Sequence, residues 1–89
     1  MKNRSRTDLI ASILEVIYRG GSTKTKIMYG AFMSYDQLNE YMSFILEAGL
    51  IEYQMNGQSH PSFKLTEKGR HFLDLQNQMN EMVTMIKSK

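Results

Sequence analysis

The chain has 89 residues, a length that fits one small domain with a modest hydrophobic core. It lacks cysteine, which excludes a disulfide framework and any cysteine-ligated zinc or iron-sulfur centre. The net charge is only +2. No apolar run approaches the roughly 20 residues that span a bilayer, so we expect an intracellular protein.

The first third of the sequence predicts two helices separated by Gly20-Gly21. Apolar residues recur every three or four positions from about Thr7 or Asp8 to Tyr18, which is the spacing of one helix face. This first helix should bury Leu9, Ile10, Ile13, Leu14 and Ile17. A short second helix follows, with Ser22 or Thr23 as its N-cap. Its inward-facing residues should be Ile27, Met28 and Ala31 or Phe32.

A third helix is predicted after the turn Phe32-Met33-Ser34. The Ser34 hydroxyl can accept a hydrogen bond from an exposed amide group of a helix that begins at Tyr35. Gly49 should end this helix, because glycine adopts the left-handed conformation of a helix C-terminus without steric cost. The spacing predicts an apolar face formed by Tyr35, Leu38, Tyr41, Met42, Ile45 and Leu46.

Two short strands joined by a turn should follow the third helix. The segment Leu50–Met55 alternates apolar and polar residues with the period of a half-buried strand, whose inward side chains are Ile51, Tyr53 and Met55. Asn56-Gly57 supplies turn residues, and Phe63–Leu65 alternates again as the second strand. Pro61 fits a loop or a sheet edge but not a central strand.

A long final helix is predicted after Thr66. Thr66 can cap it, and no helix breaker precedes Lys87 because Gly69 is tolerated in the first turn. Apolar residues then alternate gaps of three and four, as in a coiled-coil seam of about two heptads. The three-helix core cannot cover this helix along its whole length, so we expect a homodimer with an interface of Phe72, Leu75, Met79, Met82, Val83 and Ile86. The alternative is a helix that folds back over its own domain or frays.

Several sequence motifs accompany this order of elements: Gly20-Gly21, the lysines of the second helix, Met33–Leu38, Leu46–Ile51 and Leu65–Gly69. Together they resemble the small archaeal winged helix-turn-helix regulators. The resemblance implies a mainly α fold with a small β-hairpin, that is, a winged helix-turn-helix plus a long C-terminal coiled-coil helix that pairs two subunits antiparallel. Residues 1–66 would form the winged helix-turn-helix domain and residues 67–89 the dimerisation helix, in a single compact unit.

The same resemblance implies a function and a location. Members of this family are proposed to act as transcriptional regulators or as chromatin-associated proteins. We therefore expect this chain to bind double-stranded DNA as a homodimer, in the cytoplasm and associated with the nucleoid.

Charge is distributed unevenly along the chain, which limits where DNA phosphates can bind. Residues 1–33 carry a balance of +4 and residues 34–48 a balance of −3, so a phosphate-binding surface must come mainly from the first third. The best candidates are Lys24, Thr25 and Lys26, at the start of the second helix. Arg4 and Arg6 are further candidates on an N-terminal arm. The alternatives are ordinary surface lysines and a solubilising tail.

The third helix occupies the position of a DNA-recognition helix. Gln37 and Asn39 have the paired donor and acceptor that can read adenine in a major groove. Tyr35 and Ser43 can meet phosphate or sugar. The alternative is a solvated polar helix face.

The hairpin offers little charge to a duplex. Gln58 and His60 lie in its loop, and Lys64 is the one basic residue nearby. A wing that enters the minor groove usually presents arginine or lysine. A modest contribution to DNA binding and a plain hairpin are both compatible with this sequence.

Catalysis has few candidate residues. His60 and His71 are the only histidines, and Gly20-Gly21 lacks the lysine that follows in a phosphate-binding P-loop. We therefore expect no enzymatic activity, no cofactor and no functional metal. The main rival function is a winged-helix module that binds another protein instead of DNA, since an acidic third helix would suit that role.

Overall fold

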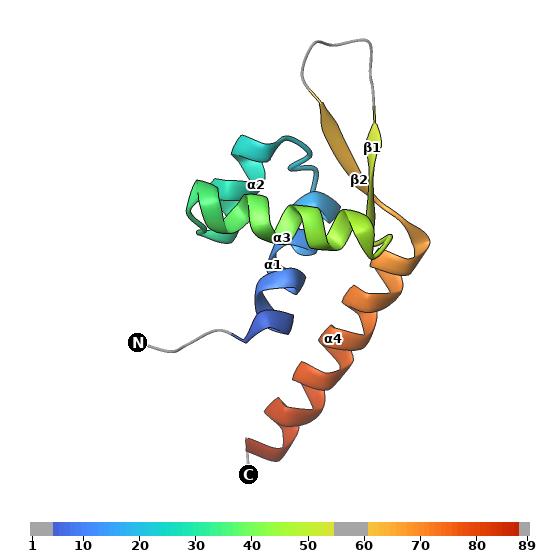
Figure 1. The fold of residues 1–89 in the computed structure, drawn as a ribbon. Helices are drawn as coiled ribbons and strands as arrows, with labels where there is room; N and C mark the ends of the chain where they lie inside the picture. The colour runs from blue at the N-terminus through green and yellow to red at the C-terminus, as the bar shows by residue number, and fades with distance from the viewer. Residues whose placement is uncertain (1–4, 55–60, 88–89) are drawn as a thin grey trace.

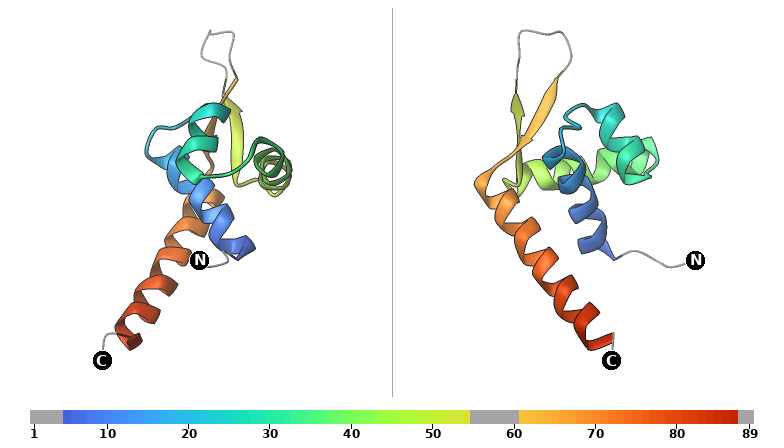
Figure 2. Two further views of the ribbon diagram at one scale, coloured as in Figure 1. Left: turned by 90° about the vertical axis from the view of Figure 1, so that its left-hand side faces the viewer. Right: turned by 180° about the vertical axis from the view of Figure 1, so that it is seen from behind.

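The computed structural model describes residues 5–54 and 61–87 and has the predicted mainly α architecture (Figure 1). The chain order is α1 (Arg6–Tyr18), α2 (Lys24–Ala31), α3 (Tyr35–Glu47), β1 (Ile51–Gln54), β2 (Ser62–Leu65) and α4 (Glu67–Lys87). The first three helices cluster together, the hairpin extends from one side, and α4 runs away on the other (Figures 1 and 2). The protein is therefore elongated, with extents of 51 × 29 × 21 Å.

Helix α1 supplies the largest share of the hydrophobic core. Its buried residues are Ile10, Ile13, Leu14 and Ile17, while Leu9 is only half-buried. The helix begins at Arg6, slightly before the predicted start, because Ser5 and Asp8 form a capping box. The Asp8 amide donates to the Ser5 hydroxyl at 3.0 Å, and the Ser5 amide donates to the Asp8 carboxylate at 3.4 Å. Arg6 is consequently a helical residue and not part of an extended arm, which corrects the prediction.

The turn between α2 and α3 follows the predicted boundaries. Thr23 caps α2 and Ser34 caps α3, each accepting a hydrogen bond from an amide three residues later. Of the two residues predicted to face inward at the end of α2, Ala31 is buried, whereas Phe32 is 86% exposed. Phe32 has a φ of 57°, in the left-handed region, and this turn of the backbone directs its side chain outward.

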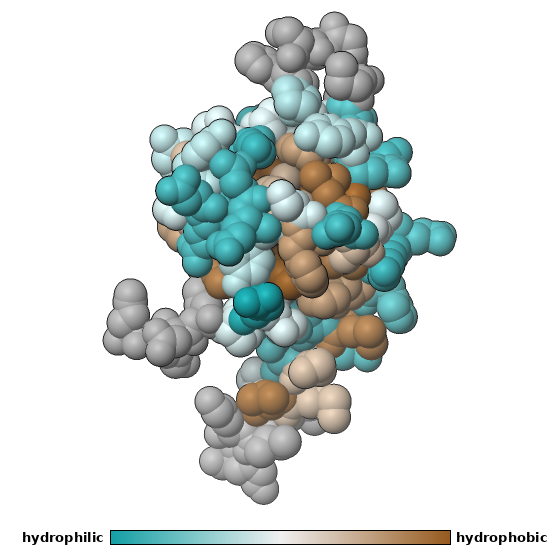
Figure 3. Space-filling view, viewed as in Figure 1, coloured by the Kyte–Doolittle hydropathy of each residue, from teal (hydrophilic) through white to brown (hydrophobic). Residues whose placement is uncertain are grey.

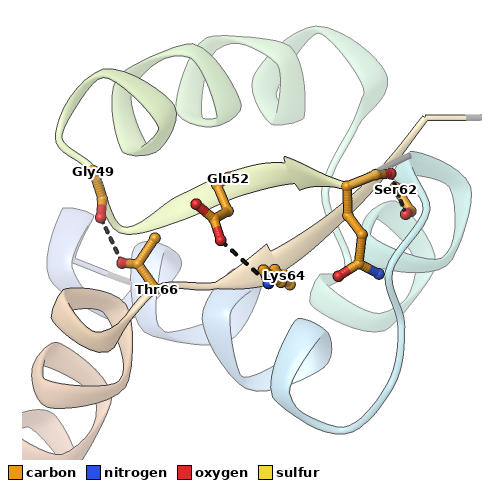
Figure 4. A network of polar contacts seen from close by, with 6 residues as sticks. Gly49, Glu52, Ser62, Lys64 and Thr66 are labelled. Carbon is orange, nitrogen blue, oxygen red and sulfur yellow. Dashed lines mark hydrogen bonds and ion pairs between the residues drawn. The ribbon is translucent and has the colours of Figure 1, made fainter. Parts of the chain in front are cut away.

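The hairpin pairs β1 and β2 antiparallel, with Ile51 opposite Leu65 and Gln54 opposite Ser62. Ile51 and Phe63 are buried as predicted, but Tyr53 is 60% exposed, so the prediction of a buried Tyr53 was wrong. The Tyr53 ring instead covers Phe63 from outside, with ring centroids 5.0 Å apart. The Ser62 hydroxyl donates to the Gln54 carbonyl at 2.8 Å (Figure 4). Met55 and the turn Asn56-Gly57 lie outside the described residues.

Three contacts fix the start of α4 against the end of α3. Thr66 caps α4 by accepting from the Gly69 amide at 3.1 Å, and its own hydroxyl donates to the Gly49 carbonyl (Figure 4). The Lys68 ammonium donates to the Ala48 carbonyl at 2.7 Å. Gly69 is required rather than merely tolerated, because a Cβ there would overlap the carbonyl oxygen of Leu50.

The second half of α4 projects beyond the hydrophobic core (Figure 1). Of the α4 side chains described up to Thr84, Leu73 and Gln76 are the last that are buried, and the Gln76 amide donates to Asp8 of α1 at 3.1 Å. From Asn77 to Thr84 every residue is exposed. Among the described helices, none combines the length and apolar character needed to cross a membrane.

Candidate nucleic-acid interface

The first turn of α2 forms a basic surface beside the start of strand β2. Lys24, Thr25 and Lys26 follow the Thr23 cap, so two ammonium groups lie where the helix dipole is positive. Pro61 approaches this turn and lines a hollow together with Thr23, Lys24 and Thr25. The Phe63 amide donates to the Ser22 carbonyl at 2.9 Å, which ties the segment before α2 to strand β2.

Lys24 also connects α2 to α3. Its ammonium lies 5.7 Å from the centroid of the Tyr35 ring, the first residue of α3. Within residues 5–54 and 61–87, no ion pair involves Lys24 or Lys26. The amino-terminal ends of α2 and α3 and the uncompensated Lys24 therefore share one surface, which is suited to binding anions. Lys26 adds a second charge on the other side of the same turn, near Gly21.

The exposed face of α3 is acidic along its centre, as the charge balance of residues 34–48 indicates. Asp36, Glu40, Ser43 and Glu47 are all exposed and follow one line along the helix, opposite the buried Leu38, Met42 and Ile45. Gln37 is exposed on one side of this line, and Asn39 is half-buried on the other. The two amide side chains predicted to read bases thus flank an acidic centre.

The hairpin supplies one basic side chain to the described part of the candidate interface, and this side chain has a partner. The Lys64 ammonium lies 3.4 Å from the Glu52 carboxylate on the neighbouring strand (Figure 4). Both side chains are about half exposed, so the pair is solvated and weak. The sequence did not show this pairing, because it depends on the register that places residue 52 opposite residue 64.

The remaining predicted site residues are scattered or not described. Arg6 lines a small hollow with Glu40, Tyr41 and Phe44 and is separate from the basic turn of α2. Arg4, Gln58 and His60 lie outside the described residues.

Two exposed aromatic residues near the candidate interface were not predicted. Tyr29 is exposed on α2, and Phe32 is exposed in the turn before α3. A left-handed residue at the end of α2 could have been anticipated from the tight turn, but glycine or asparagine usually occupies such a position.

Known proteins resemble this chain along most of its length. A family of winged helix-turn-helix proteins matches residues 3–84. This chain belongs to the winged helix-turn-helix family. An uncharacterized protein of Methanocaldococcus jannaschii is 30% identical over 86 residues, a match that covers 97% of this chain and 80% of that protein.

Solved structures share the winged helix-turn-helix fold with this chain. The DNA-binding protein Sso10a-2 from Sulfolobus solfataricus superposes with a TM-score of 0.80 at 17% identity, covering 96% of this chain and 87% of its own. ZitR from Lactococcus lactis, solved in complex with DNA, superposes with a TM-score of 0.74 at 18% identity. That match covers 99% of this chain and 61% of ZitR. At these identities the likeness concerns the fold alone.

Proposed function

We propose that this chain is a double-stranded DNA-binding protein that acts as a homodimeric transcriptional regulator or chromatin-associated protein. The observation that carries the proposal is the basic first turn of α2, whose Lys24 lies against Tyr35 at the amino terminus of α3. A helix-turn-helix uses this geometry to place one helix end on the phosphate backbone while the next helix enters the major groove.

Similar proteins support this proposal. Sso10a-2 is a DNA-binding protein, and ZitR has been solved on DNA. Winged helices also bind proteins, so the fold by itself leaves the ligand open. The two uncompensated lysines favour a polyanion.

The proposed dimer uses the apolar stripe of α4. Leu75, Met79, Met82 and Val83 are 47 to 64% exposed, although each is a large apolar side chain. Phe72 is half-buried at the start of the stripe, and the side chain of Ile86 lies outside the described residues. A helix of 21 residues is about 30 Å long at 1.5 Å per residue, so the stripe is long enough for two heptads. We accordingly assign DNA binding to residues 1–66 and dimerisation to residues 67–89.

A salt titration against duplex DNA of mixed sequence tests the proposal. We expect micromolar or tighter binding at low salt, with log affinity falling linearly as log salt concentration rises, because each phosphate contact releases counterions. A free single strand of the same composition is the control. Absence of binding to any duplex at low salt would remove the DNA proposal.

A second candidate function rests on the acidic centre of α3. Asp36, Glu40 and Glu47 repel phosphate, and they suit a basic protein surface instead. A winged-helix interaction module would fail the duplex titration and still form the α4 dimer. The titration therefore separates the two candidates.

A further inference from the structure

Two large aromatic side chains are exposed along α2, beyond its basic first turn. Tyr29 is 70% exposed and Phe32 is 86% exposed. Thr25 stands four residues before Tyr29 and seven before Phe32, so the backbone positions of the three residues follow one line along the helix. At 1.5 Å per residue this line is about 10 Å long. It connects the turn that we assign to phosphates with the turn that precedes α3.

The backbone at Phe32 adopts a conformation that glycine usually provides at the end of a helix. Its φ is 57°, in the left-handed region. The Phe32 amide donates to the Tyr29 carbonyl at 3.3 Å, and the amide of the buried Met33 donates to the Met28 carbonyl at 3.1 Å. These hydrogen bonds hold the turn, whereas the exposed ring adds little to the core. Because glycine would serve the fold better at this position, the strained phenylalanine indicates a role in binding.

The charge around the two rings favours an anionic ligand. Between Glu15 and Asp36 the chain has no carboxylate, and its charged residues there are Arg19, Lys24 and Lys26. The exposed face of α3 is acidic instead, and Figure 3 shows hydrophilic residues over its amino-terminal half. Exposed aromatic rings beside lysines are the combination with which proteins hold nucleic-acid strands, because every base can stack on a ring.

Base pairing decides which bases can use these rings. Within residues 5–54 and 61–87, the one pair of aromatic rings in contact is Tyr53 with Phe63, so the rings of Tyr29 and Phe32 stack on no other ring. A paired base lies inside the duplex, whereas an unpaired base can leave the stack and lie on an aromatic side chain. The line of about 10 Å corresponds to roughly three nucleotides along one strand of a duplex. An unpaired base that close to the bound phosphates can therefore reach the rings.

We infer that Tyr29 and Phe32 stack on unpaired bases of a DNA duplex whose phosphates lie at the first turn of α2. This inference rests on the DNA-binding function proposed above and deepens it, because it names locally opened or mismatched DNA as the preferred ligand. Phe32 is the main contact, since its ring is the more exposed and its backbone is held by the turn. Tyr29 extends the same surface by one helix turn. The preference should be independent of base sequence, because every base offers a face for stacking.

Anisotropy titrations of two DNAs test the inference: a fully paired duplex, and the same duplex with a short unpaired bubble. The natural protein should bind the bubble at least about fivefold more tightly, the lower end of what one stacked base contributes. Phe32→Gly should remove most of this preference and leave the affinity for the paired duplex unchanged, whereas Phe32→Trp should retain the preference. The fluorescent base 2-aminopurine, placed in the bubble, should lose fluorescence on binding the natural protein and keep it with Phe32→Gly.

Phe44→Ala is the matched control, because it removes an exposed ring from α3 and should leave the ratio of the two affinities unchanged. Urea denaturation provides a second control. Phe32→Gly should be at least as stable as the natural protein, since glycine relieves the left-handed strain. A clear loss of stability would show that the ring supports the fold, and it would overturn the inference.

Three binding results would also overturn the inference. The first is equal affinity of the natural protein for the bubble and the paired duplex. The second is a loss by the same factor for both DNAs in Phe32→Gly. The third is a preference that survives Phe32→Gly combined with Tyr29→Ala, because it would then come from the flexibility of the bubble. No binding to either DNA would instead overturn the DNA-binding function itself.

Discussion

The ammonium of Lys24 lies 5.7 Å from the centroid of the Tyr35 ring, so the first residues of α2 and α3 are in direct contact. This contact joins the two helix ends that we assign to DNA. It also holds Lys24 in place, which reduces the side-chain entropy lost when that lysine binds a phosphate.

Lys24→Ala combined with Lys26→Ala should weaken binding to all duplex sequences alike. If each lysine neutralises one phosphate, the slope of log affinity against log salt should flatten by about 2. The control is Arg19→Ala with Arg70→Ala, which removes the same charge from residues already engaged with Glu15 and Asp74. Equal slopes for the two double variants would place the phosphate surface elsewhere.

Gln37→Ala and Asn39→Ala should affect sequence discrimination rather than general affinity. A good base contact contributes about 1 to 3 kcal/mol of discrimination, so the preference for a selected site should shrink while binding to random DNA persists. Competition between selected and random duplexes measures this ratio. An unchanged ratio in both variants would show that neither amide reads a base.

Glu52→Gln should strengthen DNA binding if the hairpin lies against the duplex. The change frees the Lys64 ammonium from its partner at 3.4 Å, whereas the free energy of unfolding should change by less than about 1 kcal/mol, as for exposed pairs. Glu15→Gln is the control, because it removes the same charge from another ion pair. A gain of equal size in both variants would reflect net charge alone and leave no role for the hairpin.

Gly69→Ala should destabilise the fold by about 1 to 3 kcal/mol, although alanine normally favours a helix. The new Cβ would overlap the Leu50 carbonyl, a backbone atom that cannot move alone. Gly30→Ala should cost less, because its Cβ meets the side chain of Val16. Urea denaturation measures both. A Gly69→Ala protein as stable as the natural one would contradict the close approach of α4 to Leu50.

Met82→Glu should convert the protein into a folded monomer by placing a charge in the α4 seam. DNA affinity should fall as well, since two linked binding surfaces act at a much higher effective concentration than one. Asn80→Glu introduces the same charge outside the seam and serves as the control. A protein that remains dimeric with both Met82→Glu and Ile86→Glu would show that the seam is misplaced.

Local signals in the sequence were sufficient for most of the fold. Thr23, Ser34 and Thr66 cap the helices that were predicted from them, since capping depends on residues only three positions apart. The family match and the superposed structures confirm the winged helix-turn-helix fold. Local signals did not predict the need for glycine at position 69, because the atom that excludes a side chain there is the carbonyl oxygen of Leu50, 19 residues earlier in the sequence.

The candidate site was harder to predict, because its surroundings depend on residues that are distant in the sequence. Tyr53 shares a sheet face with the buried Ile51 and Phe63, but it lies farther along the hairpin from Ile51 and is 60% exposed, which the alternation alone does not reveal. The Glu52 partner of Lys64 depends on strand register, and the acidic line on α3 appears only once the buried face is known. The residues assigned to DNA contact and to the dimer seam remain predictions that the variants above test.

The contacts of Thr66, Lys68 and Gly69 hold α4 at a fixed angle to α3, and this rigidity has a consequence for operator geometry. In the proposed dimer the length of α4 sets the distance between the two recognition helices. Inserting one heptad would move them apart by about 10 Å, roughly three base pairs along a duplex. The preferred spacing of the two DNA half-sites should lengthen by the same distance, so the length of α4 would determine which sites the protein selects.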